Sequence, residues 1–434
     1  MYTIIQSFGS LGYPESKSTI VLGNPTQVYA SPHPVLCLPP LPSSPRSTPC
    51  CLQLSSSLRV LRLSTAVRSF FLPALQRRVT CAAGQQTANA ACCALFPVLE
   101  DIQTNMFAGD TCSDASHTAL RVAFHDAIGF STTQKSFGTG ADGSIFLFGE
   151  TELGFDANLG IADAFNLEVP FIKKHNISVA DFIQFAATVS LTKCPGILQP
   201  PFMFGRVDAT APAPDGTVPE PFQNVDVILA RMADAGLTAA DTVALLASHS
   251  IAGADDVDPT LSGLPFDSTP SIFDTQFFVE TQLRGTLFPG SSGNQGEVMS
   301  AIAGEIRLQS DHLLARDTAT NCLWQANVNN QAHMASSFQA AFLKMGLLGQ
   351  DVSKMVDCSD VIPTPPPLAA ANAQSVFPPG LTHADVEQAC ATTMFPNLAT
   401  APGAALTVPQ IVQSPLTDGD CDDDGEGCDF SSFA

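Results

Sequence analysis

The chain has 434 residues, 45% of them hydrophobic, which is enough to bury the core of one large domain or of two to three smaller ones. Its formal net charge of −22 disfavours nucleic acid and anionic membrane surfaces as partners and favours cations as ligands or substrates. No uninterrupted apolar run reaches about eighteen residues, so a membrane span is not expected.

Residues 1–78 differ in composition from the rest of the chain. They contain seven of the 19 Lys and Arg residues but a single acid, Glu15, and they end at the dibasic pair Arg77–Arg78. We interpret them as a leader or propeptide-like segment. Arg68 interrupts the apolar stretch that a signal peptide needs, and the composition also fits a transit peptide.

The cysteines help to choose between these compartments. Ten cysteines follow residue 78, and none has the paired C-x-x-C spacing that is typical of zinc sites. Dispersed cysteines indicate disulfides and an oxidising compartment. Asn176 begins an Asn-Ile-Ser glycosylation acceptor, which agrees with this. Secretion is therefore favoured over mitochondrial import.

Helical periodicity dominates the first half of the remaining chain. Apolar residues recur every three or four positions at 90–107, and a capping-box pattern of Ser178 and Asp181 precedes a helix at 179–191. A Pro-rich interruption at 210–221 then separates two halves. Strand-like alternation is scarce, so the predicted fold class is mainly α.

The second half continues this pattern. Helices are predicted at 222–236, at 239–250 after a cap at Thr238, and as one long helix at 321–349.

This organisation predicts a helical domain at 79–362, with one half at about 79–210 and the other at about 222–362. Residues 363–434 are rich in Pro and Ala and become acidic near the end. We predict an extended tail there rather than a core element.

The apolar segment 119–130 carries a fixed cation beside a histidine. Arg121 and His125 are four residues apart and therefore share one helix face, with Phe124 beside them. A guanidinium disfavours the protonated form of a nearby histidine, which then can act as a base, while the cation stabilises developing negative charge. Cleavage of hydrogen peroxide requires both a base and a cation that stabilises negative charge. The alternative is a buried structural histidine with Arg121 reaching the surface, and for an isolated helix this alternative is favoured.

His249 ends a second apolar helix. It is either structural or a metal or haem ligand, oriented by a carboxylate such as Asp311.

Two loops are rich in oxygen ligands of the kind that suits calcium. Asp142 and Ser144 lie in one, and Ser250, Asp267, Thr269 and Asp274 lie in or near the other. Neither has EF-hand spacing, and ordinary Asp-Gly and Asp-Ser-Thr-Pro turns are the alternative.

Eight segments in sequence order carry a family resemblance. They are LRVAFHDAIGFS, GADGSI, DANLGIAD, VSLTKCPG, LLASHS, PFDSTP, FDTQFFVETQLRGTLFPG and GEIRLQSDH. From about Val79 through the tail, the chain resembles the secreted fungal class II haem peroxidases, which include lignin, manganese, versatile and generic peroxidases. The resemblance implies a mainly α fold in which two helical halves sandwich one haem b, with two structural calcium sites and about five disulfides.

The resemblance also implies roles for individual residues. His125 would be the distal acid–base residue and Arg121 its electrostatic partner, with Phe124 packed over the haem. Asn158 would orient His125, and Glu152 would support Asn158. On the proximal side, His249 would ligate the haem iron with Asp311 hydrogen-bonded behind it.

Calcium and disulfide assignments follow from the same resemblance. The implied distal calcium ligands are Asp126, Gly140, Asp142 and Ser144. The implied proximal calcium ligands are Ser250, Asp267, Thr269, Ile272 and Asp274. The implied disulfides are Cys81–Cys93, Cys92–Cys358, Cys112–Cys194, Cys322–Cys390 and Cys421–Cys428.

The reductant is less clearly indicated. Relatives that oxidise lignin units directly carry a surface Trp where this chain has Ala244, and the single Trp, Trp324, lies elsewhere. All three tyrosines lie before residue 79. A surface aromatic radical is therefore disfavoured.

A manganese site is only partly retained. Asp255 matches one manganese ligand of the family and Asp114 replaces a second, whereas Thr118 stands where the third would be and Gly253 where an Arg is expected. Two carboxylates could still bind Mn²⁺ more weakly.

We therefore predict a secreted, monomeric peroxidase that uses hydrogen peroxide to oxidise phenolic or other small reductants by one-electron steps at the haem edge, with lignin degradation as its setting. The alternative is an atypical manganese peroxidase that uses Asp255 and Asp114. A remote alternative is a non-catalytic secreted calcium-binding protein.

Overall fold

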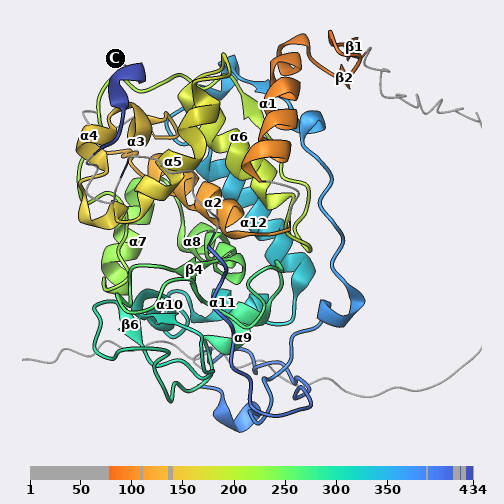
Figure 1. Cartoon of the computed structure of the whole chain (residues 1–434). Helices are drawn as coiled ribbons and strands as arrows, with labels where there is room; N and C mark the ends of the chain where they lie inside the picture. The colour runs from red at the N-terminus through yellow and green to blue at the C-terminus, as the bar shows by residue number, and fades with distance from the viewer. Residues whose placement is uncertain are drawn as a thin grey trace, which may run out of the picture. The chain divides into compact units, whose positions relative to one another are not determined.

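The computed structural model describes residues 78–107, 111–134, 140–387, 390–413, 421 and 427–433. All the described residues lie within one compact unit, Pro73–Ala434 (Figure 1). The predicted leader lies outside the described residues except for Arg78.

Helices dominate the described residues, which confirms the predicted fold class. The α-helices are α1 (Leu95–Asp101), α2 (Asp114–Ala127), α3 (Ser144–Leu147), α4 (Gly149–Glu152), α5 (Ile161–Ile172), α6 (Val179–Leu191), α7 (Val225–Asp234), α8 (Ala239–Leu245), α9 (Gln276–Glu280), α10 (Gln309–Leu314), α11 (Asn321–Asn327) and α12 (Gln331–Met345). A 3₁₀ turn, Leu246–Ile251, extends α8 and carries His249.

The strands of the described residues are two residues long and form four antiparallel pairs. They are β1 (Val79–Thr80) with β2 (Gln86–Thr87), β3 (Met203–Phe204) with β8 (Val356–Asp357), β4 (Gly253–Ala254) with β5 (Leu264–Pro265), and β6 (Glu297–Val298) with β7 (Arg307–Leu308).

Helix α6 is the central helix of the unit. Its segment, VADFIQFAATVSL, is apolar on every side, and all of its residues are buried. The Ser178 hydroxyl accepts a hydrogen bond from the Asp181 amide at 3.0 Å, so the predicted cap is formed. The Asp181 carboxylate pairs with the buried Arg206 guanidinium at 3.0 Å, rather than with the Ser178 amide as in a complete capping box. Helix α2 carries Arg121 and His125. Its contact with α6 is the most extensive contact between two helices in the described part of the chain.

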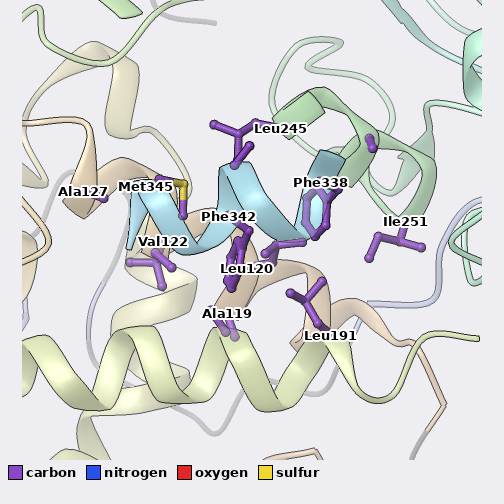
Figure 2. Close-up of a cluster of buried hydrophobic side chains, with 14 of the residues drawn as sticks. Ala119, Leu120, Val122, Ala127, Leu191, Leu245, Ile251, Phe338, Phe342 and Met345 are labelled. Carbon is purple, nitrogen blue, oxygen red and sulfur yellow. The ribbon is translucent and has the colours of Figure 1, made fainter. Parts of the chain in front are cut away.

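A second layer of the core forms where α12 packs against α8. Figure 2 shows Phe338, Phe342 and Met345 of α12 among buried residues of the neighbouring elements, including Leu120 and Leu245. The Phe338 and Phe342 rings are stacked with centroids 5.6 Å apart, because residues four apart lie above one another on a helix.

The long helix predicted at 321–349 is wrong, because the chain breaks between α11 and α12. Asn329 adopts a left-handed conformation with φ of 52°, which Asn tolerates better than most residues and which ends a right-handed helix. Its side-chain oxygen accepts a hydrogen bond from the Ser375 amide at 3.0 Å. The break therefore anchors the segment that follows residue 363.

The segment after Pro363 is irregular, as predicted, but it contributes to the core, contrary to the prediction. Phe377, Phe395 and Val408 are 1%, 3% and 3% exposed. The described part pairs with the body of the unit through single bridges, such as Leu283 with Val386. Widely spaced apolar residues in a Pro-rich sequence have no periodicity, and for this reason their burial was not predicted.

Five disulfides connect the predicted cysteine pairs. They are Cys81–Cys93, Cys92–Cys358, Cys112–Cys194, Cys322–Cys390 and Cys421–Cys428. The bond between Cys92 and Cys358 closes a loop of 266 residues, so it ties the start of the domain to the end of its helical part.

Asp101 at the end of α1 joins two distant segments. Its carboxylate accepts hydrogen bonds from Asn105 at 2.7 Å, from Lys174 at 2.8 Å and from the His175 ring at 2.7 Å. Burial alone would raise the pKa of Asp101, but these three partners outweigh it and lower the pKa from 3.8 to about 2.

Asp101→Asn should therefore lower the free energy of unfolding by about 2 kcal/mol at pH 7. The folded-state pKa is depressed, so the wild-type advantage is fully present above pH 4 and is lost as the pH falls towards 2. Thermal unfolding of both proteins across this range checks the prediction. An equal difference at pH 7 and pH 2 would contradict it.

None of the helices in the described residues has the length and apolar character needed to span a bilayer.

Candidate active site

A cavity of about 650 Å³ lies between α2 and the turn that follows α8. Arg121, Phe124 and His125 line it from α2, and His249 lines it from the 3₁₀ turn with Phe266 beside it. The two histidines that were predicted from separate motifs therefore face one cavity.

His125 is held in one tautomer. Its Nδ1 lies 2.8 Å from the Asn158 side-chain oxygen, and the Asn158 amide nitrogen donates to the Glu152 backbone carbonyl at 2.8 Å. Because the amide nitrogen is occupied, the Asn158 oxygen faces His125 and Nδ1 must donate. This arrangement leaves a lone pair on Nε2, which can accept a proton.

The electrostatics of His125 favour the neutral base. Burial and, to a smaller extent, the Arg121 charge lower its pKa to about 3, although the hydrogen bond with Asn158 works in the opposite direction. The predicted support of Asn158 by Glu152 is present through the Glu152 backbone. The Glu152 carboxylate itself accepts a hydrogen bond from the Ala213 amide at 2.8 Å.

Arg121 is oriented by the loop before α5. Its guanidinium donates to the Leu159 carbonyl at 2.6 Å. Gly160 has φ of 76°, and a Cβ there would lie 2.6 Å from an Asp256 carboxylate oxygen and 3.1 Å from the Arg121 guanidinium. Glycine at this position therefore leaves the space into which both charged groups reach.

His249 is oriented for ligation from the opposite side. Its Nδ1 lies 2.9 Å from a carboxylate oxygen of Asp311, which is 1% exposed. The ring packs against Phe266 and Phe277, with centroids 4.8 Å and 5.6 Å away. Since Nδ1 donates to Asp311, Nε2 is available as a ligand to a metal.

The cavity fits a haem. Its volume lies in the range of cofactor pockets, and its walls include Phe124, Phe266, Ile251 and Leu314. His249, with the Asp311 carboxylate behind it, would supply the nitrogen ligand that binds the haem iron.

The predicted distal calcium residues come together behind α2. Asp126, Asp142 and Ser144 are each 1% exposed. The Gly143 amide donates to Asp126 at 3.0 Å, and the Ser144 amide donates to Asp142 at 3.1 Å. Burial raises the pKa of Asp126 well above its ordinary value, and the nearby Asp142 charge adds to this. Two buried carboxylates in this position fit a bound cation.

Gly140 could contribute a backbone oxygen to the same place. It has φ of 99°, and a Cβ there would lie 2.3 Å from the Leu348 carbonyl, so only glycine fits.

The predicted proximal calcium residues also cluster. Thr269 donates to Asp274 at 3.1 Å and its amide donates to Asp267 at 2.7 Å, while the second Asp267 oxygen is buried without a hydrogen-bond partner. Burial raises the pKa of Asp274 to about 7 and that of Asp267 well above its ordinary range. The Ile272 amide donates to the Thr269 carbonyl at 2.9 Å, which holds this loop closed.

Ser250 follows His249 directly and is fully buried, with its hydroxyl donating to the Ala247 carbonyl at 2.8 Å. No three His, Cys, Asp or Glu side chains within the described ranges are placed to hold one metal ion. A cation at either site would therefore need hydroxyl and carbonyl oxygens as well, which suits the six to eight ligands of Ca²⁺.

The possible manganese residues line the same cavity as the histidines. Asp114, Thr118 and Asp255 all contribute to its wall. The Asp255 oxygen Oδ1 accepts three hydrogen bonds, from Ser262, from the Gly263 amide and from Gln413. Gly253 borders Ile411, whose side chain would lie 2.8 Å from a Cβ on this glycine.

Sequence reasoning missed His117, which lines the cavity four residues before Arg121. Burial lowers its pKa to about 4, and the Asp255 charge works in the opposite direction. Its spacing from Arg121 is the signal that could have revealed it. Leu159, Phe222, Ile411 and Gln413 were also missed, because they lie in irregular segments.

Several other predicted positions have a clear structural setting. Asn176 is exposed, as a glycosylation acceptor must be. Ala244 is 5% exposed and Trp324 is completely buried, with its indole nitrogen donating to the Phe278 carbonyl at 3.2 Å. Neither position offers a surface aromatic.

The cavity of this helical domain lies between two oriented histidines. His125 is kept neutral, and His249 presents Nε2 for a metal. This is the organisation of a haem-dependent oxidoreductase. Comparison with known proteins agrees. Residues 98–330 match the peroxidase family, and residues 333–413 match the fungal peroxidase extension region.

Characterised relatives match over almost their whole length. Ligninase LG2 of Phanerodontia chrysosporium is 50% identical over 364 residues, covering 83% of this chain and 98% of the relative. Manganese peroxidase 3 of Phlebia radiata is 54% identical over 368 residues, covering 83% of this chain and 99% of the relative. Versatile peroxidase VPS1 of Pleurotus eryngii is 54% identical over 346 residues, covering 78% of this chain and 93% of the relative.

The chain belongs to the class II fungal haem peroxidases. It is a hydrogen-peroxide-dependent oxidoreductase, and the alternative of a non-catalytic calcium-binding protein is wrong.

Proposed function

We propose that this peroxidase oxidises small phenolic compounds by one-electron steps at the mouth of the cavity. The observation that carries the proposal is the apolar rim of the cavity. Leu159 and Phe222 both line it and are 43% and 36% exposed. An exposed aromatic ring beside a small cavity offers a stacking surface for a phenol.

His125 and Arg121 would act on the peroxide. The free Nε2 of His125 takes the proton from one peroxide oxygen and returns it to the other, so that the second oxygen leaves as water. The Arg121 guanidinium stabilises the negative charge that develops on the leaving oxygen. When bound, haem supplies the iron that is oxidised by peroxide and then takes electrons from the reductant. Overall, one hydrogen peroxide and two phenols give two waters and two phenoxyl radicals.

Asn158 and Asp311 would position the two histidines. Asn158 keeps the His125 proton on Nδ1, and Asp311 does the same for His249. We also propose that the two buried carboxylate clusters bind Ca²⁺ and that the protein is secreted and monomeric. Secretion fits the five disulfides and the exposed Asn176.

The second candidate reductant is Mn²⁺. Asp255 and Asp114 line the cavity from two different elements, and carboxylate oxygens suit this ion. Thr118 offers no carboxylate, so we propose weaker binding than a site with three acids would give. Mn²⁺ oxidation that depends on Asp255 would distinguish this function from phenol oxidation.

Phe222→Ala tests the phenol proposal. Loss of the ring should raise the KM for a small phenol by about 3- to 10-fold and leave the rate of reaction with peroxide unchanged. Val227→Ala is a matched control, because Val227 is 51% exposed and does not belong to the cavity wall. Equal phenol kinetics for Phe222→Ala and the control would contradict the proposal.

A further inference from the structure

The C-terminal extension crosses the cavity wall at residues 408–413, which we call the extension strap. The Val408 amide donates to the Ala303 carbonyl at 2.8 Å, and the Ile411 amide donates to the Gly263 carbonyl at 2.7 Å. The Gln410 side chain donates to the Ser262 carbonyl at 2.8 Å. The bonds of Gln410 and Ile411 hold the strap against the β4–β5 loop, and the bond of Val408 holds it against the segment between β6 and β7.

Three glycines make room for the strap. A Cβ on Gly304 would lie 2.1 Å from the Val408 carbonyl oxygen, and one on Gly263 would lie 2.5 Å from the Ile411 carbonyl oxygen. A Cβ on Gly253 would lie 2.8 Å from the Ile411 side chain. The strap therefore fits a surface that larger residues would close, and Ile411 and Gln413 become part of the cavity wall.

Gln413 hydrogen-bonds to Asp255, a carboxylate of the cavity wall that also accepts hydrogen bonds from within the β4–β5 loop. Its amide nitrogen donates to Asp255 Oδ1 at 3.0 Å. The same oxygen accepts from the Ser262 hydroxyl at 2.9 Å and from the Gly263 amide at 2.7 Å. Among the described residues no group donates to the second oxygen, Oδ2. Three donors on one oxygen fix the carboxylate and leave the other oxygen for a ligand.

We propose that Gln413 is a positioning residue for Asp255, so that the C-terminal extension prepares this carboxylate to bind a divalent cation substrate at the cavity. The inference rests on the second proposed reductant, Mn²⁺, and adds a residue outside the peroxidase core to its site. Gln413 does not touch the ion. It acts by keeping Oδ1 occupied and Oδ2 directed away from the strap.

The test measures Mn²⁺ binding and turnover in the haem-loaded full chain. Binding is followed by titrating Mn²⁺ against the haem absorption spectrum, and oxidation is followed separately with Mn²⁺ and with a small phenol. Gln413→Ala should raise the Kd and KM for Mn²⁺ about tenfold while the kcat for phenol stays unchanged. Gln410→Ala is the matched control, because Gln410 is anchored in the same strap but does not contact Asp255. Asp255→Ala should abolish the titration.

Four other results would overturn the inference in different ways. If Asp255→Ala binds Mn²⁺ like the wild type, neither the positioning role nor the manganese function holds. If Asp255→Ala loses binding but Gln413→Ala does not, the manganese function stands and the role of Gln413 is wrong. If Gln413→Ala binds Mn²⁺ more tightly, the strap shields Asp255 rather than preparing it. Equal losses in Gln413→Ala and Gln410→Ala would assign the effect to strap anchoring instead of to Gln413.

Discussion

His125→Ala should slow the reaction with hydrogen peroxide by about 10²- to 10⁴-fold, the usual contribution of general acid–base catalysis. The reason is geometric. His125 Nδ1 is committed to Asn158 at 2.8 Å, and its low pKa of about 3 keeps Nε2 unprotonated across the working range of pH. Without this side chain, no base in the same position can move a proton between the peroxide oxygens.

Stopped-flow absorption of the haem-loaded protein measures this rate directly. His117→Ala is the matched control, because His117 lies on the same helix and lines the same cavity. We expect the control to react with peroxide at a rate close to that of the wild type. A His125→Ala protein that binds haem and still reacts as fast as the control would remove His125 from the mechanism.

Removing the proposed calcium ions should produce the largest change in stability. Asp267 and Asp126 are 0% and 1% exposed, and each lies near a second buried carboxylate. Leaving buried charges without their partner costs about 3–5 kcal/mol. Chelation at pH 7 should therefore lower the Tm by at least several degrees, and added Ca²⁺ should restore it.

Substitutions separate a calcium effect from a general loss of stability. Asp267→Asn should weaken the dependence of Tm on Ca²⁺. Asp258→Asn is the control, since Asp258 is also buried; although burial raises its pKa, hydrogen bonds from Thr260 and Ser291 outweigh this and lower it, so the carboxylate charge is stabilised without a cation. If chelation leaves the wild-type Tm unchanged, the calcium assignment is wrong. Equal dependence on Ca²⁺ in both variants would show that Asp267 is not a ligand.

The effect of calcium loss should also reach the active site. Asp126 directly follows His125, and Ser250 directly follows His249. Loosening either cluster would therefore disturb the backbone that carries a histidine of the cavity.

Local patterns in the sequence were sufficient for several helices, including α6, and for the pairing of Arg121 with His125. Helix α6 spans the predicted residues 179–191, and the predicted cap at Thr238 forms, as a complete capping box with Asp241. These features depend on residues within a few positions of one another, so periodicity and capping chemistry determine them. The family resemblance added the five disulfide pairings, which spacing left open.

Only the tertiary structure showed that the C-terminal extension reaches the site. The family resemblance already paired His125 with Asn158 and His249 with Asp311, across 33 and 62 positions. The contact of Gln413 with Asp255, across 158 positions, had no signal in the sequence. The break at Asn329 and the burial of Phe377 follow from the path of the C-terminal extension, which has no periodic pattern. Long-range contacts depend on how loops are packed, and neighbouring residues in the sequence do not encode that. The sequence by itself therefore determined a peroxidase with Arg121 and His125 on one helix, and the tertiary structure decided that its C-terminal extension also forms the wall of the cavity.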